Sequence, residues 1–167
     1  MVGEIEHVFQ NNTQMTNNDI LRKIRYAFDF SDSKMIQIFA KADREVTREE
    51  VSNWMKNEED PDWKSLHDKM LATFLNGLIN DRRGKKEGIQ PKPEKTLNNN
   101  IIMRKLKIAL KLTDDDMLAV FKLVEFDISK HEINAIFRKP EKSQFRLCKD
   151  QFLRNFLHGM QVKYRKK

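Results

Sequence analysis

The residues able to perform metal or nucleophilic chemistry are few and widely spaced along this chain. The four histidines, His7, His67, His131 and His158, form no pair at the i,i+3 or i,i+4 spacing that places two ligands on one helix face. Cys148 is the only cysteine, so no Cys-x-x-Cys pair exists. We therefore expect no bound metal and no cofactor, and we interpret the histidines as solvated surface residues.

An internal repeat gives most of these residues an aligned counterpart. When the sequence is shifted by 82 positions, residues 15–85 align with residues 97–167 without a gap, and 18 of the 71 pairs are identical. A fixed period of this kind indicates two copies of one structural unit. A unit of this size buries only a thin core alone, so we expect the two repeats to pack together.

The alignment also bears on the candidate catalytic residues. Cys148 aligns with Leu66, which favours a buried structural thiol over a nucleophile. Asp68 aligns with Asp150, and these acids suit a helix start; acid–base catalysis would need carboxylates buried beside each other. No glycine-rich phosphate loop is present. We favour a non-enzymatic protein, and an enzyme without a linear signature stays as an alternative.

Each repeat is predicted to contain four helices, because apolar residues recur at helical spacing and no alternating strand pattern is present. The third helix opens with a capping box in both copies, Thr47-x-x-Glu50 and Ser129-x-x-Glu132. The other predicted helices cover residues 18–29, 32–42 and 66–82, and in the second copy 100–111, 114–124 and 148–164.

Two further pairs of identical residues carry structural predictions. Asn18 and Asn100 are expected to be the N-caps of the first helix in each copy. Gly77 and Gly159 fall inside the fourth helix, where glycine costs about 1 kcal/mol relative to alanine. Its presence in both copies indicates that a neighbouring backbone comes close to this helix.

The predicted fold is therefore all-α, with two tandem, gaplessly aligned four-helix repeats related by pseudo-symmetry. Residues 1–14 are interpreted as a leader or extension outside the repeat, and residues 86–96 as an exposed linker containing glycine, proline and lysine. No apolar run approaches the roughly 20 residues of a membrane helix, so we expect no membrane association. The single cysteine favours a cytoplasmic location.

The net charge of +7 comes from the second repeat. Residues 15–85 carry 13 basic and 13 acidic side chains, whereas residues 97–167 carry 16 basic and 8 acidic ones. This asymmetry predicts an acidic partner, either a polyanion such as nucleic acid or an acidic protein. The candidate contact residues are Arg104, Lys107, Lys111, Arg138, Lys139, Lys142, Arg146, Lys149, Lys163, Arg165, Lys166 and Lys167.

An ordinary solvated face of an amphipathic helix also explains Arg104, Lys107 and Lys111 without any ligand. Three further considerations limit how the charge is interpreted. Tyr164 is the only aromatic residue in the basic tail, so contacts to nucleic acid should be to phosphate and insensitive to sequence. A helix-turn-helix is disfavoured, because Glu49 and Glu50 would repel phosphates at the helix end that reads bases. A protein–protein adaptor that uses apolar surface left open between the repeats is the leading alternative to a polyanion-binding module.

Several segments resemble the YehS family of duplicated bacterial domains of unknown function. They are Asn17-Asn18-Asp19-Ile20-Leu21-Arg22, Phe74-Leu75-Asn76-Gly77-Leu78-Ile79, Arg83-Gly84-Lys85 and Asn98-Asn99-Asn100-Ile101. The resemblance extends over residues 15–167. It implies a small cytoplasmic bacterial protein and provides no functional residues to transfer.

Overall fold

The computed structural model describes residues 15–165, which form eight α-helices and no strand. The first repeat contributes α2 (Asn17–Phe28), α3 (Asp32–Lys41), α4 (Arg48–Met55) and α5 (Asp68–Arg83). The second contributes α6 (Asn99–Ala109), α7 (Asp114–Lys122), α8 (Lys130–Ile136) and α9 (Asp150–Tyr164). The prediction of an all-α fold with two four-helix repeats is confirmed.

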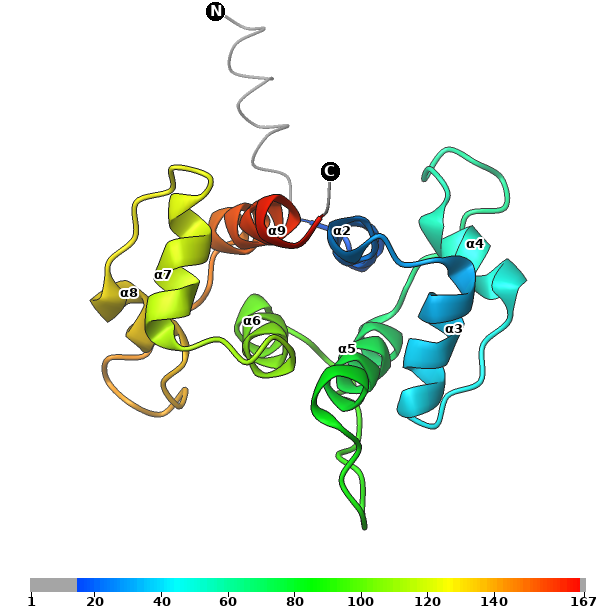
Figure 1. Cartoon of the computed structure of the whole chain (residues 1–167), viewed down its shortest axis with the longest axis horizontal. Coiled ribbons are helices and arrows are strands. Elements are labelled where there is room, and N and C mark those ends of the chain that lie inside the picture. The colour runs from blue at the N-terminus through cyan, green and yellow to red at the C-terminus, as the bar shows by residue number, and fades with distance from the viewer. Residues whose placement is uncertain (1–14, 166–167) are drawn as a thin grey trace, which may run out of the picture.

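Four helices form the centre of the molecule, and the other four cover its flanks (Figure 1). The central helices are α2, α5, α6 and α9, with α3 and α4 on one side and α7 and α8 on the other. The first helix of each repeat packs most extensively on the fourth helix of the other repeat, α2 on α9 and α6 on α5. Their apolar residues join one continuous core, so the two repeats depend on each other for burial.

A pseudo-twofold axis runs close to the viewing direction of Figure 1, since a half-turn in the plane carries α2 onto α6, α5 onto α9 and α3 onto α7. Arg82 and Tyr164 occupy equivalent positions, and the Arg82 guanidinium lies 6.0 Å from the Tyr164 ring centroid. The ends of α5 and α9 therefore meet close to this axis. A feature and its symmetry mate consequently lie at a similar depth along this axis, on opposite sides of it.

The helix starts follow local capping chemistry. Ser31 and Thr113 cap α3 and α7, and both predicted capping boxes open α4 and α8. The prediction for the first helix was wrong, because Thr16 and Asn98 are the N-caps of α2 and α6.

Asn18 and Asn100 are instead the second residues of their helices, and each is buried. The Asn18 Nδ2 donates to the carbonyls of Trp54 and Lys64 at 3.0 and 2.8 Å, and its Oδ1 accepts from the Leu66 N–H at 3.0 Å. Asn100 makes the same three bonds to the equivalent residues of the second repeat. These amides hold the long loop between the third and fourth helices, whose residues belong to no helix and so lack the regular hydrogen bonds of one.

The neighbouring asparagine and a matched aspartate connect the two repeats. The Asn17 Nδ2 donates to Asp68 Oδ1 at 2.7 Å, while Asp68 Oδ2 accepts from the backbone N–H of Leu97 at 2.8 Å. Asp150 repeats this arrangement between Asn99, at 2.6 Å, and the Met15 N–H, at 3.3 Å. The two aspartates therefore lie at helix starts, as expected. Each also joins the two repeats by accepting a hydrogen bond from a backbone N–H of the other repeat.

The fourth helix begins two residues later than predicted, at Asp68 and Asp150. The reason is that Leu66 and Cys148 use their backbone groups to bind the asparagine side chains, which keeps both residues outside the helix.

Both interior glycines face a backbone, as the sequence predicts. A Cβ placed on Gly77 would collide with the carbonyl oxygen of Ile38 in α3, and one on Gly159 would meet the carbonyl of Val120 in α7 at 2.5 Å. These contacts are equivalent, and α3 packs on α5 over a long stretch. Glycine is therefore required for the close approach of these helices.

Replacing Gly77 by Ala or Leu should lower the free energy of unfolding by about 1–3 kcal/mol, because the obstructing atoms are backbone. This loss should appear for alanine even though alanine favours a helix. Urea unfolding followed by circular dichroism measures it, with Lys69→Ala on the exposed face of α5 as the control. An unchanged midpoint for Gly77→Ala would contradict the close approach.

Removing the buried amide in Asn18→Ala should lower the free energy of unfolding by about 3 kcal/mol, since two buried backbone groups and one part-buried group lose their partner. The control is Asn155→Ala, because Asn155 makes an exposed hydrogen bond to Gln151 and should cost within about 0.5 kcal/mol. Equal effects of the two variants would argue against a special role for Asn18.

Candidate functional site

The described histidines do not assemble a site. His67, His131 and His158 are exposed and lie on different elements, and His7 is outside the described residues. Within residues 15–165, no group of three or more His, Cys, Asp or Glu side chains is arranged to hold a metal ion.

Cys148 lies in the hydrophobic core, where it is 6% exposed beside residues of the second repeat. Burial raises the pKa of its thiol from 9.0 to about 12, and the negative charge of Asp150 adds to this shift. The thiolate is the reactive form of cysteine, so this thiol is inert near neutral pH.

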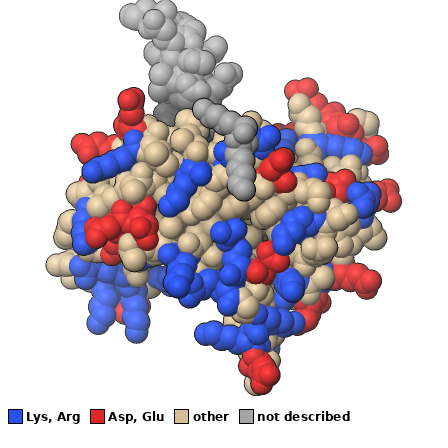
Figure 2. Space-filling model, viewed as in Figure 1, with Lys and Arg blue, Asp and Glu red and all other residues tan. Residues whose placement is uncertain are grey.

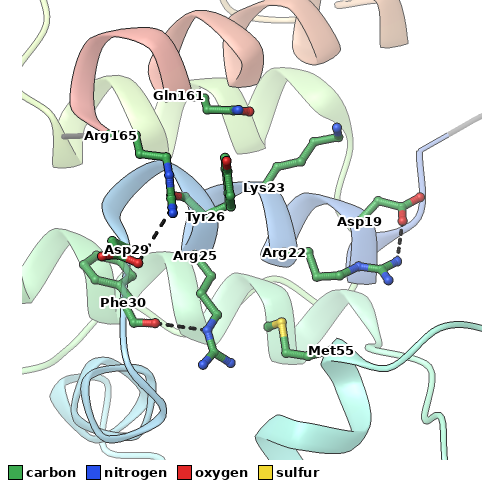
Figure 3. Close-up of a pocket in the computed structure, with 10 residues that line it drawn as sticks. All are labelled: Asp19, Arg22, Lys23, Arg25, Tyr26, Asp29, Phe30, Met55, Gln161 and Arg165. Carbon is green, nitrogen blue, oxygen red and sulfur yellow. Dashed lines mark hydrogen bonds and ion pairs between the residues drawn. The ribbon is translucent and has the colours of Figure 1, made fainter. Parts of the chain in front are cut away.

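A hollow of about 610 Å³ lies along α2 in the first repeat (Figure 3). We call it the first hollow. Arg22 is paired with Asp19 at 2.6 Å, and Arg165 lies 3.7 Å from Asp29, as the dashed lines in Figure 3 show. Arg25 donates to the Phe30 carbonyl and also pairs with Asp32 at 2.7 Å. Acidic neighbours thus neutralise the three arginines of this hollow.

A second hollow of about 430 Å³ lies along α6 at the equivalent place. It is lined by Arg83, Arg104, Lys107, Ile108, Lys111, Leu112, Thr113 and Phe137. We call it the second hollow. The pseudo-twofold axis relates the two hollows, which lie on opposite sides of it along α2 and α6 (Figure 1).

The two hollows share a cationic frame and differ in their acids. Three pairs of cations occupy equivalent positions: Arg22 and Arg104, Arg25 and Lys107, and Arg165 and Arg83. The acidic positions have diverged, because Asp19 is replaced by Ile101 and Asp29 by Lys111. Asp29 and Lys111 even share a left-handed backbone, with φ of 54° each. The second hollow therefore contains four cationic residues and no acidic one in its lining.

Only one cation of the second hollow is neutralised by an ion pair among the described residues. Lys107 pairs with Asp114 at 2.6 Å and lies 4.6 Å from the Phe137 ring centroid. Arg104 donates to the Phe137 carbonyl at 3.3 Å, which leaves its charge uncompensated. Arg83 and Lys111 are exposed and form no ion pair within residues 15–165. This arrangement suits an anionic ligand.

Two segments of the chain, residues 17–84 and 99–166, match the family model described as "Protein of unknown function (DUF1456)". The chain belongs to this family. It is also 41% identical over 147 residues to the Escherichia coli (strain K12) protein described as "Uncharacterized protein YehS", over 87% of this chain and 94% of that protein. The resemblance found in the sequence is thereby confirmed, and no solved structure matches the chain.

The duplicated DUF1456 fold brings together only part of the predicted basic set. Arg104, Lys107 and Lys111 converge on the second hollow, and Arg138 and Lys139 follow its lining residue Phe137 directly. Lys142 lies exposed in the loop between α8 and α9.

Arg146 and Lys149 lie at the other end of α6. The backbone around them is bound to Asn100 at the start of this helix, which is about 16 Å along the axis from Lys111.

The basic C-terminal residues are divided as well. Arg165 lies in the first hollow, where it donates to the Tyr26 carbonyl at 2.6 Å and stacks 3.7 Å from the Tyr26 ring centroid. Lys163 is exposed on the last turn of α9. Lys166 and Lys167 are outside the described residues.

Arg83 is a lining residue that the charge analysis missed, since it belongs to the neutral first repeat. It reaches the second hollow because α5 packs on α6 of the other repeat. Its identity with the aligned Arg165 was the available signal. Lys105 shows the opposite case: its side chain is only 12% exposed and is used between the repeats, in a hydrogen bond to Asn76 and an ion pair with Glu94.

Within residues 15–165, no helix combines the length and the apolarity required to cross a membrane.

Cys148 should react slowly with a thiol reagent at pH 8, because its pKa of about 12 keeps the thiol protonated and its burial keeps the reagent away from it. Labelling should accelerate only as urea unfolds the protein. Since burial raises this pKa, the stabilising contribution of the thiol is complete below pH 9 and is lost as the pH rises from 9 towards 12. Fast labelling of the folded protein would overturn the structural role.

Proposed function

We propose that this protein is a non-enzymatic binding module that holds nucleic acid by its phosphates through the basic second repeat. One observation carries the proposal. The second hollow has four cationic residues and no acidic lining, whereas the equivalent first hollow contains Asp19 and Asp29.

The helix dipole does not account for this difference. Basic residues near the C-terminal ends of α2, α5, α6 and α9 complement the negative ends of these helices, and this holds in both repeats. The helix dipole disfavours acidic residues at these helix ends to the same extent in both hollows. The replacement of Asp29 by Lys111 therefore points to a requirement of the second repeat alone.

The distribution of charge favours a polymer over a compact acidic protein patch. Lysine and arginine side chains gather over the lower middle of the face in Figure 2, where α6, the end of α5 and the linker lie in Figure 1. Further basic residues, Arg138, Lys142 and Arg146, continue along the second repeat. A nucleic acid strand presents negative charge at regular spacing over such a length.

The adaptor alternative depends on apolar surface left open between the repeats. The facing helices bury most of their apolar residues in one core. The large apolar residues left exposed beside this contact, Tyr26 and Ile108, are single side chains in separate hollows, which is little surface for an adaptor.

Fluorescence anisotropy with labelled single-stranded RNA and duplex DNA tests the proposal on the intact chain. If about four phosphates are neutralised, the affinity for a single strand should fall roughly 50-fold between 50 and 200 mM salt. Sequence should have little effect, because phosphate contacts carry no sequence information. Absence of binding at low salt, or stronger binding of polyglutamate at equal charge, would contradict a nucleic-acid partner.

Charge-matched variants at equivalent positions locate the binding surface. Arg104→Glu should weaken binding at least tenfold, while Arg22→Glu changes the net charge equally and should have a much smaller effect. Asp29→Lys gives the first hollow the residue of the second and should raise the affinity. Equal losses for Arg22→Glu and Arg104→Glu would mean that net charge alone, rather than the second hollow, causes binding.

A further inference from the structure

The second hollow differs from a flat basic patch, and we propose that it is a discrete site for a terminal phosphate of a nucleic acid strand. The proposal rests on the proposed function and deepens it. Internal phosphates of the strand would then contact the surrounding basic surface, while the phosphomonoester at one end enters the second hollow.

The charge of the second hollow matches a phosphomonoester. Arg83, Arg104 and Lys111 come from the end of α5, the middle of α6 and the residue two positions beyond α6, and they line one concavity. An internal phosphodiester carries one negative charge, whereas a phosphomonoester carries about 1.5 to 2 at neutral pH and three acceptor oxygens. Three uncompensated cations therefore suit the terminal group better. Two of them are arginines, whose planar forks bind phosphate oxygens in pairs.

The remaining lining provides space for the terminal nucleoside. Its apolar residues are Ile108, Leu112 and Phe137, and Ile108 is 46% exposed although it is a large aliphatic side chain. The second hollow has a volume of about 430 Å³ and opens broadly to solvent, so a terminal base can contact its apolar residues while the cations hold the phosphate.

The site is held in shape before any ligand binds. The Lys111 N–H donates to the Ile108 carbonyl at 3.1 Å, and the Leu112 N–H donates to the Lys107 carbonyl at 3.0 Å. These bonds fix the left-handed backbone that presents Lys111. Asp114 lies next to the site, but its ion pair with Lys107 neutralises its charge in place. The backbone of the site therefore needs little reordering when an anion binds, and the ordering cost falls on the exposed side chains of Arg83, Arg104 and Lys111.

Competition and direct titration of the intact chain test the proposal at physiological salt. Three unlabelled single strands of one sequence are compared: one with a 5′-phosphate, one with a 3′-phosphate and one with hydroxyl groups at both ends. Each competes against a reference strand of the same sequence that has hydroxyl ends and an internal fluorophore. At least one phosphorylated end should bind tenfold or more tighter than the hydroxyl strand. Adenosine monophosphate should compete better than inorganic phosphate, because only the nucleotide uses the apolar wall.

Variants assign the effect to the second hollow. Lys111→Asp and Arg104→Ala should abolish the preference for a phosphorylated end, so that phosphorylated and hydroxyl strands bind equally. Both strands should bind more weakly than to the unchanged protein, because a cation is lost, and the remaining binding should still depend on salt. Arg22→Ala, at the position equivalent to Arg104, should retain the preference. Thermal unfolding confirms that each variant is folded.

The outcomes separate the two proposals. Salt-dependent binding that ignores the end group overturns the terminal-phosphate site and leaves the proposed function standing. A preference that survives in both Lys111→Asp and Arg104→Ala overturns its assignment to the second hollow. No binding of any strand overturns both proposals.

Discussion

The structure depends on buried amide side chains that satisfy backbone groups of a long loop. In each repeat, the connection between the third and fourth helices is mostly exposed, but its last part crosses the start of the first helix, where Leu66 or Cys148 is buried. The peptide groups covered there must find partners. Asn18 supplies these partners in the first repeat and Asn100 in the second, with the same three hydrogen bonds. Their conformation decides where the fourth helix begins and hence how the two repeats meet.

The contact between the repeats follows from this arrangement. Asp68 and Asp150 each bind an asparagine of their own repeat and a backbone N–H of the other. These paired contacts align α2 with α9 and α6 with α5, so that the ends of α5 and α9 meet close to the pseudo-twofold axis. The two hollows are a consequence, because each lies along the first helix of one repeat and receives an arginine from the fourth helix of the other.

Duplication provides two copies of one cationic frame whose electrostatics have diverged. The first hollow compensates its three arginines with Asp19, Asp29 and Asp32, and among its described lining residues only the cation of Lys23 has no ion pair. In the second hollow only the pair of Lys107 with Asp114 persists. The fold requires the helices and their contacts in both copies. It places no such demand on the surface of the hollows, which were free to change without loss of the core.

The sequence by itself determined the duplication, the helices, the capping boxes, the buried thiol and the glycine contacts. Each of these follows from local chemistry or from a periodic pattern, and each could be compared across two copies. Tertiary structure decided the roles of Asn18 and Arg83. Asparagine is a common helix-capping residue, yet the hydrogen-bond partners of Asn18 are 36 to 48 residues away in the sequence. They become its neighbours only when the loop folds over α2. Arg83 is counted with a neutral repeat, yet helix packing across the pseudo-twofold axis places it among the cations of the other, because the site is formed by both repeats together.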